Sequence, residues 1–163
     1  MSDGVISPED VKKGGPSVLV YLPAGEVLCA PVPGTAEGKV VFIQSFYNGK
    51  EVTDLTWTFA QGKMTSMTGS GPGFEKFKAD YEAVGEGKDL FAFVDFGINP
   101  SLRLWPASKT GNWVQSGMIT VGIGNNTWAG GDNKIGYSYG DHLPGSTVTL
   151  DGKTIVENGV LKF

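Results

Sequence analysis

Apolar residues along this chain fall into short runs that glycine, proline and asparagine separate. The run Lys39 to Tyr47 ends at Asn48-Gly49, a dipeptide typical of a tight β-hairpin turn. Leu55, Trp57 and Phe59 then alternate with threonines, which predicts a strand with one buried face. Gln61-Gly62 and the run Met64 to Thr68 predict a second hairpin, and further strands are predicted at Ser17 to Tyr21, Glu26 to Ala30, Leu90 to Phe96 and Met118 to Ile123.

Helical periodicity is confined to two places. The main helix is predicted between Gly71 and Gly85, where large apolar residues recur every three or four positions: Phe74, Phe77, Tyr81 and Val84. A short helix is predicted to begin at Ser7, because Pro8 and two acids follow it. Residues 124 to 146 show no regular pattern and are predicted to form a long Gly/Asn-rich loop of functional interest.

Two turn dipeptides, Asp151-Gly152 and Asn158-Gly159, predict a terminal meander of short strands. No internal repeat or linker divides the 163 residues, and 25 glycines without a repeat period suit a protein with many turns. We therefore expect a single domain, residues 1-163, of the α+β class and predominantly β, with antiparallel or mixed strands and one main helix.

Charge and composition exclude some partners. Charged residues make up 18% of the chain, the net charge is −4, and no basic cluster offers a surface for nucleic acid. No apolar run approaches the ~20 residues that span a bilayer, and the first residues do not resemble a signal peptide. A single cysteine, Cys29, excludes an internal disulfide and is expected to be a small buried apolar residue. We expect a cytoplasmic protein.

Several collinear segments resemble a known scaffold. They are Asp3-Gly4-Val5, Leu22-Pro23-Ala24-Gly25-Glu26-Val27, Ala36-Glu37-Gly38, Gly97-Ile98-Asn99-Pro100, Thr110-Gly111-Asn112, Val121 to Asn126, Gly130-Gly131 and Leu150-Asp151-Gly152-Lys153. In this order they are similar to the C-terminal domain of the aminopeptidase T family of metallopeptidases. The 2,5-dihydroxypyridine dioxygenases share that scaffold. The resemblance implies that the family's N-terminal α/β domain is not part of this sequence.

The resemblance also implies where metal ligands would stand. Glu26 retains the first of them. The positions of the others carry Phe93, Thr120, Ser138 and Gly140, and the family's following tyrosine falls near Thr127 and Trp128. A catalytic zinc needs about three protein ligands and an open position. We therefore expect no catalytic residues, no metal and no other cofactor.

A binding role follows from the loss of these metal ligands. We expect a non-catalytic protein that binds a peptide, or a peptide-derived or aromatic small molecule, with Glu26 as a polar anchor for a ligand amine. It would serve as an accessory or product-sequestering factor in a peptide biosynthetic pathway. The expected ligand-binding residues line the vacated site: Glu26, Phe93, Thr120, Asn125, Asn126, Trp128, Ser138 and Tyr139.

Other interpretations stay open. A metal-dependent aminopeptidase or ring-cleaving dioxygenase would use a reduced metal site of Glu26, Asp141 and His142. A structural subunit would pair into a homodimer through exposed strand edges. Asp95, an acid within an apolar strand, is either a functional carboxyl or a hydrogen-bonded structural one. Five aromatic residues in or beside the loops suit either ligand recognition or a small core: Trp105, Trp113, Trp128, Tyr137 and Tyr139.

Overall fold

Two consecutive hairpins form a three-stranded antiparallel sheet, called sheet B below. In the computed structural model, which describes residues 4–103 and 114–162, its strands are β2 (Gly38–Tyr47), β3 (Lys50–Ala60) and β4 (Lys63–Ser70), in that order. Asn48 and Gly49 have φ of 51° and 74°, and Gln61 and Gly62 have φ of 50° and 74°. Positive φ at both central residues is the geometry of hairpin turns that match the twist of the strands. Both predicted hairpins are confirmed.

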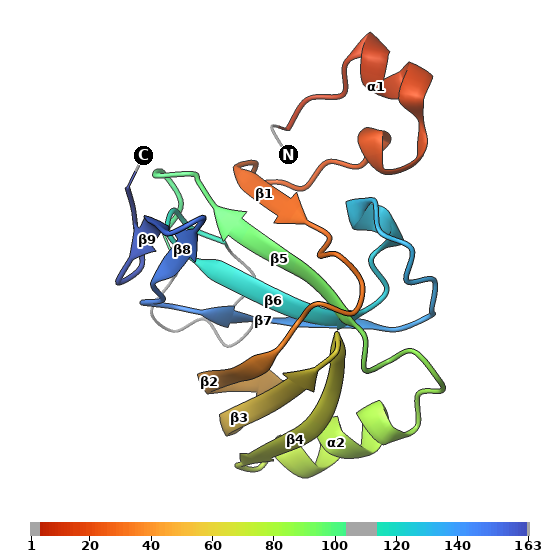
Figure 1. Cartoon of the computed structure of the whole chain (residues 1–163), viewed down its shortest axis with the longest axis vertical. Coiled ribbons are helices and arrows are strands. Elements are labelled where there is room, and N and C mark those ends of the chain that lie inside the picture. Colours follow the sequence, from red (N-terminus) through yellow and green to blue (C-terminus); the bar gives the residue numbers. More distant parts are fainter. Residues whose placement is uncertain (1–3, 104–113, 163) are drawn as a thin grey trace.

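A second antiparallel sheet, called sheet A, has the order β1-β5-β6-β7. Its strands are β1 (Glu26–Cys29), β5 (Phe91–Gly97), β6 (Ile119–Gly124) and β7 (Ser138–Leu143). Figure 1 shows the chain leaving β1, building all of sheet B, and returning to sheet A at β5. Sheet A therefore joins strands from both halves of the chain, which hairpin signals alone do not predict.

The core lies between the two sheets. Trp57 and Phe42 are fully buried in sheet B and meet edge to face, with ring centroids 4.7 Å apart. Val121 and Ile123 of sheet A belong to the same buried cluster. The helix α2 (Phe74–Glu82) lies beside sheet B (Figure 1). Its residues Phe74 and Phe77 are buried in the core cluster, as the periodicity predicts. The prediction of an α+β, predominantly β fold is confirmed.

The N-terminal residues differ from the prediction. The short helix α1 (Pro8–Lys13) forms as expected, but residues 15–18 make a 3₁₀ helix and residues 19–21 have no regular structure. The predicted strand Ser17 to Tyr21 is wrong. Gly14 and Gly15 have φ of 65° and 54°, which turns the chain away from an extended path, and the side chains that follow remain exposed. The apolar residues of this run therefore do not form a strand of either sheet.

The prediction for residues 124 to 146 is also partly wrong. This segment contains a 3₁₀ helix, Thr127–Ala129, and the strand β7, which pairs with β6 along its whole length. The C-terminal strands β8 (Val148–Leu150), β9 (Lys153–Glu157) and β10 (Val160–Leu161) form the predicted meander. No helix among the described residues is long and apolar enough to cross a membrane.

Candidate functional site

Polar side chains form a row across one face of sheet A. In the strand register, Asp95 of β5 lies opposite Thr120 of β6, and Thr120 lies opposite His142 of β7. Directly opposite residues hold their Cβ atoms about 4.5–5.5 Å apart, and alternate residues share a face. Leu28 of β1 faces Asp95 on the other side, so Glu26, two residues earlier, is a diagonal neighbour of Asp95. We call this the outer face, because the inner face packs on sheet B.

Asp95 is the most unusual residue of the outer face. Its side chain is 3% exposed, and its Oδ1 atom has no hydrogen-bond partner within the described part of the chain. Burial raises the pKa of the Asp95 carboxyl to about 7, and the nearby Glu26 charge adds to the rise, while the Phe96 N–H opposes it. An unpaired buried carboxyl is costly to the fold. The Asp95 carboxyl is thus hydrogen-bonded by the Phe96 N–H, whereas its Oδ1 atom has no partner among the described residues, so both interpretations of this acid stay open.

Glu26 is held at the start of β1 by a close backbone approach. Gly25 has φ of 120°, and a Cβ there would lie 2.4 Å from the Cβ of Asn99. The Ile98 N–H donates to the Gly25 carbonyl at 2.9 Å, and Asn99 Nδ2 donates to the Ala24 carbonyl at 2.6 Å. Glu26 is half-buried as a result, and burial raises its pKa. Two carboxyls of raised pKa thus stand side by side.

An aromatic series borders these carboxyls. Burial raises the pKa of the Tyr21 hydroxyl, and the charges of Glu26 and Asp95 raise it further, so Tyr21 lies near both acids. Its ring meets Trp128 edge to face at 6.1 Å between centroids, and Trp128 meets Phe93 in the same way at 4.9 Å. Tyr21 was expected in a buried strand, yet 42% of it is exposed. Sequence reasoning missed its place in the site.

Two glycines make room for the ring of Phe93. A Cβ at Gly122 would lie 2.1 Å from the ring, and one at Gly140 would lie 2.6 Å from it. Gly122 and Gly140 are register partners on β6 and β7, so together they form a flat floor under the aromatic side chain. Phe93 therefore fills the centre of the outer face, and its neighbours Glu26 and Asp95 define one end.

Asp141 and His142 lie on opposite faces of β7. His142 Nδ1 hydrogen-bonds Thr120 Oγ1 at 2.7 Å on the outer face. Asp141 instead accepts a short hydrogen bond from Ser45 Oγ on the inner face. The structure therefore does not bring together the reduced metal set of Glu26, Asp141 and His142. Within residues 4–103 and 114–162, no three His, Cys, Asp or Glu side chains are placed to hold a metal ion.

The remaining predicted ligand-binding residues have varied surroundings. Asn125 and Asn126 bond to the backbone: Asn125 Nδ2 donates to the Ile135 carbonyl at 2.7 Å, and Asn126 Nδ2 donates to the Ala92 carbonyl at 2.9 Å. Ser138 is exposed at the start of β7. Tyr139 points inward, where its ring lies 4.6 Å from that of Phe77. The structure thus gathers Glu26, Phe93, Thr120 and Trp128 on the outer face and places Tyr139 in the core.

Other expectations fall outside the site. Cys29 is exposed at the end of β1, not buried as expected. Trp105 and Trp113 lie outside the described residues. Tyr137 contributes to the core, where its ring packs edge to face on Tyr81. The loop aromatics therefore divide between the core and the outer face, with Trp128 alone among the described ones in contact with Phe93.

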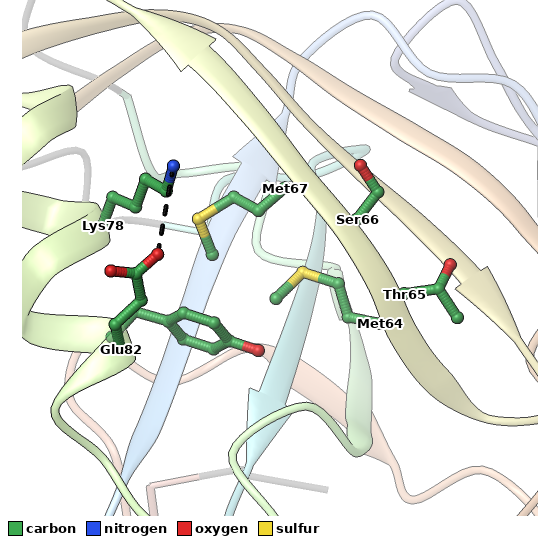
Figure 2. Close-up of a pocket in the computed structure, with 7 residues that line it drawn as sticks. Met64, Thr65, Ser66, Met67, Lys78 and Glu82 are labelled. Atoms are coloured by element: carbon green, nitrogen blue, oxygen red, sulfur yellow. Dashed lines mark ion pairs between the residues drawn. The ribbon is translucent and has the colours of Figure 1, made fainter.

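Three cavities lie in other parts of the molecule. One of about 170 Å³ lies between β4 and α2, and Tyr81 is among its lining residues. Figure 2 shows Met64 and Met67 opposite the ion pair of Lys78 with Glu82. Two others, of about 220 Å³ and 390 Å³, flank the connection between β1 and β2 and share Pro31, Ala36 and Phe91. None of these three cavities is lined by a buried acid that lacks a hydrogen-bond partner among the described residues. The outer face differs from them, because it contains Asp95.

Comparisons with known proteins bear on the fold. No family model matches the chain, and no curated protein matches it. The solved structure of 2,5-dihydroxypyridine dioxygenase from Pseudomonas putida KT2440 is similar, with a TM-score of 0.68 and 17% sequence identity. The match covers 88% of this chain and 45% of that chain, so this chain spans less than half of the dioxygenase's length. What the likeness shows is a fold shared with one part of that dioxygenase.

Proposed function

We propose that this protein is a non-catalytic binding protein that holds a peptide, or a peptide-derived or aromatic small molecule, on the outer face of sheet A. The observation that carries the proposal is the buried, partly unpaired Asp95 beside Glu26, bordered by aromatic rings. Such a site combines apolar contact area with a few polar groups that fix orientation, as ligand sites do. A role as an accessory or sequestering factor in a peptide biosynthetic pathway would fit this activity.

The aromatic series supports an aromatic or peptide ligand. The side chains of Trp128 and Tyr21 are partly exposed to solvent. Trp128 Nε1 donates a hydrogen bond to the Asn125 carbonyl at 3.0 Å, so the ring face is the part that could contact a ligand. Large rings of this kind supply contact area at a low entropic cost, which is why they dominate recognition surfaces. The ligand would gain stacking from Trp128 and polar contacts from Glu26.

Titration of the labelled protein with a panel of short aromatic peptides, followed by NMR, tests the proposal. We expect shift changes at Phe93, Thr120 and Trp128, and at least a tenfold loss of affinity in Trp128→Leu. Tyr81→Leu is the matched control, because it removes an aromatic side chain from the cavity between α2 and β4 instead. Shift changes confined to the Tyr81 cavity would contradict the proposed site.

A second candidate is a metal-dependent aminopeptidase or ring-cleaving dioxygenase. The fold likeness to a dioxygenase favours it, as do the two neighbouring carboxyls. Elemental analysis of the purified protein separates the candidates, together with melting curves in Zn²⁺, Mn²⁺ and Fe²⁺. A stoichiometric metal with a raised melting temperature would favour the enzyme, and activity on a peptide or a dihydroxypyridine would then replace our first proposal.

A further inference from the structure

The two carboxyls at one end of the outer face form no ion pair within the part of the chain that the structure describes. Neither Glu26 nor Asp95 takes part in an ion pair within the described residues, and no Lys, Arg or His contributes to the pKa shift of either carboxyl. The groups that face Asp95 are Glu26 from β1, Thr120 from β6 and Tyr21 from the N-terminal segment, with His142 beyond Thr120. Among residues 4–103 and 114–162, therefore, two carboxyls lie near each other here and no ion pair to either of them is formed.

Building on the proposed function, we propose that Glu26 and Asp95 together anchor one positively charged group of the ligand, a protonated amine, against the rings of Tyr21 and Trp128. An ammonium group has three donors and suits two carboxylates that approach from different strands. Rings beside the carboxyls add cation–π attraction. A metal ion fits less well, because a third protein ligand is lacking among the described side chains.

The unpaired Oδ1 of Asp95 is the specific feature that the amine would satisfy. It is closed to solvent in the unliganded protein. Tyr21, which is 42% exposed and lies near both acids, would border the bound amine. The ligand would then donate one hydrogen bond to Asp95 and another to Glu26, which is already half-exposed.

Phenethylamine and its neutral counterpart 2-phenylethanol are suitable probes, because they differ in the charged group and share the ring. At pH 8, NMR titration should show phenethylamine binding at Tyr21, Glu26 and Asp95 at least tenfold more tightly than the alcohol. Glu26→Gln and Asp95→Asn should remove that preference. Glu82→Gln, which alters an exposed acid on α2, is the matched control and should keep it.

The pH dependence gives a second readout. Asp95 is protonated below about pH 7, because its pKa is raised to about 7, so the amine should bind more weakly at pH 5.5 than at pH 8. In Asp95→Asn this difference should fall to less than half of its wild-type value. Glu82→Gln, the exposed acid on α2, is again the control and should retain the difference.

The outcomes separate this inference from the function it builds on. Equal binding of the amine and the alcohol on the outer face would overturn the ammonium site and leave the binding function standing. If neither probe nor any aromatic peptide shifted outer-face signals, both would fail. A preference for the amine that survives both Glu26→Gln and Asp95→Asn would place the anchor elsewhere and also overturn the inference.

Discussion

Single residues decide the chemistry of the outer face, and Asp95 is the clearest case. A carboxyl that is 3% exposed loses most of its hydration, and here it has gained no hydrogen bond at Oδ1 in return. The nearby Glu26 makes the ionised form still less favourable. The sequence contained a signal for it, since Asp95 is the only acid in an otherwise apolar strand, but only the hydrogen bonds of the folded structure distinguish an unpaired acid from a bonded one.

The raised pKa of Asp95 predicts a pH dependence of stability. The folded state holds the proton up to about pH 7, whereas the unfolded chain loses it near the ordinary value of 3.8. Stability from this group is therefore complete below pH 4 and is lost as the pH rises to 7, by at most roughly 1.4 kcal/mol per pH unit. Urea unfolding between pH 4.5 and 7.5 should show this loss.

Asp95→Asn provides the comparison, because asparagine cannot ionise. Between pH 4.5 and 7.5 the variant should gain unfolding free energy relative to the wild type. Asp54→Asn alters an exposed acid on β3 and should follow the wild type. Parallel curves for the wild type and Asp95→Asn would show that Asp95 is not the titrating group.

At the level of elements, α1 is a helix whose order is local. Ser7 Oγ accepts from the Asp10 N–H at 3.2 Å, and Asp10 Oδ2 accepts from the Ser7 N–H at 2.9 Å, which forms a complete capping box. Ser7 Oγ also donates to Asp10 Oδ2 at 2.6 Å, and this hydrogen bond, together with the one from the Ser7 N–H, lowers the pKa of the Asp10 carboxyl. No residue of α1 is buried, so the cap, and not packing, holds its ends in place.

Ser7→Ala should therefore loosen α1 without weakening the whole fold. The local loss should be about 1 kcal/mol, the usual effect of removing an N-cap. Hydrogen exchange at the amides of Val11 and Gly14, which close the helix, should quicken by several fold, while the urea midpoint stays the same. Ser17→Ala is the control. A lower midpoint in Ser7→Ala would mean that α1 contributes to global stability.

At the scale of the whole molecule, a buried polar cluster links the two sheets. Ser45 of β2 is 4% exposed and donates a short hydrogen bond to Asp141 of β7, and Tyr139 OH lies 3.3 Å from both side chains. Asp141 Oδ1 also accepts from the His142 N–H at 2.8 Å. Burial raises the pKa of Asp141, so losing a partner there is costly.

Ser45→Ala should lower the free energy of unfolding by about 1–3 kcal/mol, the usual effect of leaving a buried acceptor without its donor. Ser66→Ala, an exposed serine on β4, should change it little. Urea unfolding of the two variants, monitored by tryptophan fluorescence, makes the comparison. Equal stability of Ser45→Ala and the wild type would show that Tyr139 or water replaces the lost donor.

The sequence by itself determined the hairpins, the main helix and the meander. Four turn dipeptides adopt positive φ because of their own residue types: Asn48-Gly49, Gln61-Gly62, Asp151-Gly152 and Asn158-Gly159. In α2, the helical spacing of the apolar residues predicts which face is buried. These features depend on neighbours along the chain. The apolar run Ser17 to Tyr21 did not predict its structure, because positive φ at Gly14 and Gly15 turns the chain and residues 15–18 form a 3₁₀ helix.

Tertiary structure alone decided the candidate site. Which face of sheet A a residue occupies depends on strand pairing between distant segments, and a shift of one residue reverses it. This is why Tyr139 lies in the core and Asp95 lies near Glu26. Local sequence carries turn and helix preferences, whereas the meeting of two carboxyls across separate strands is a property of the folded sheet.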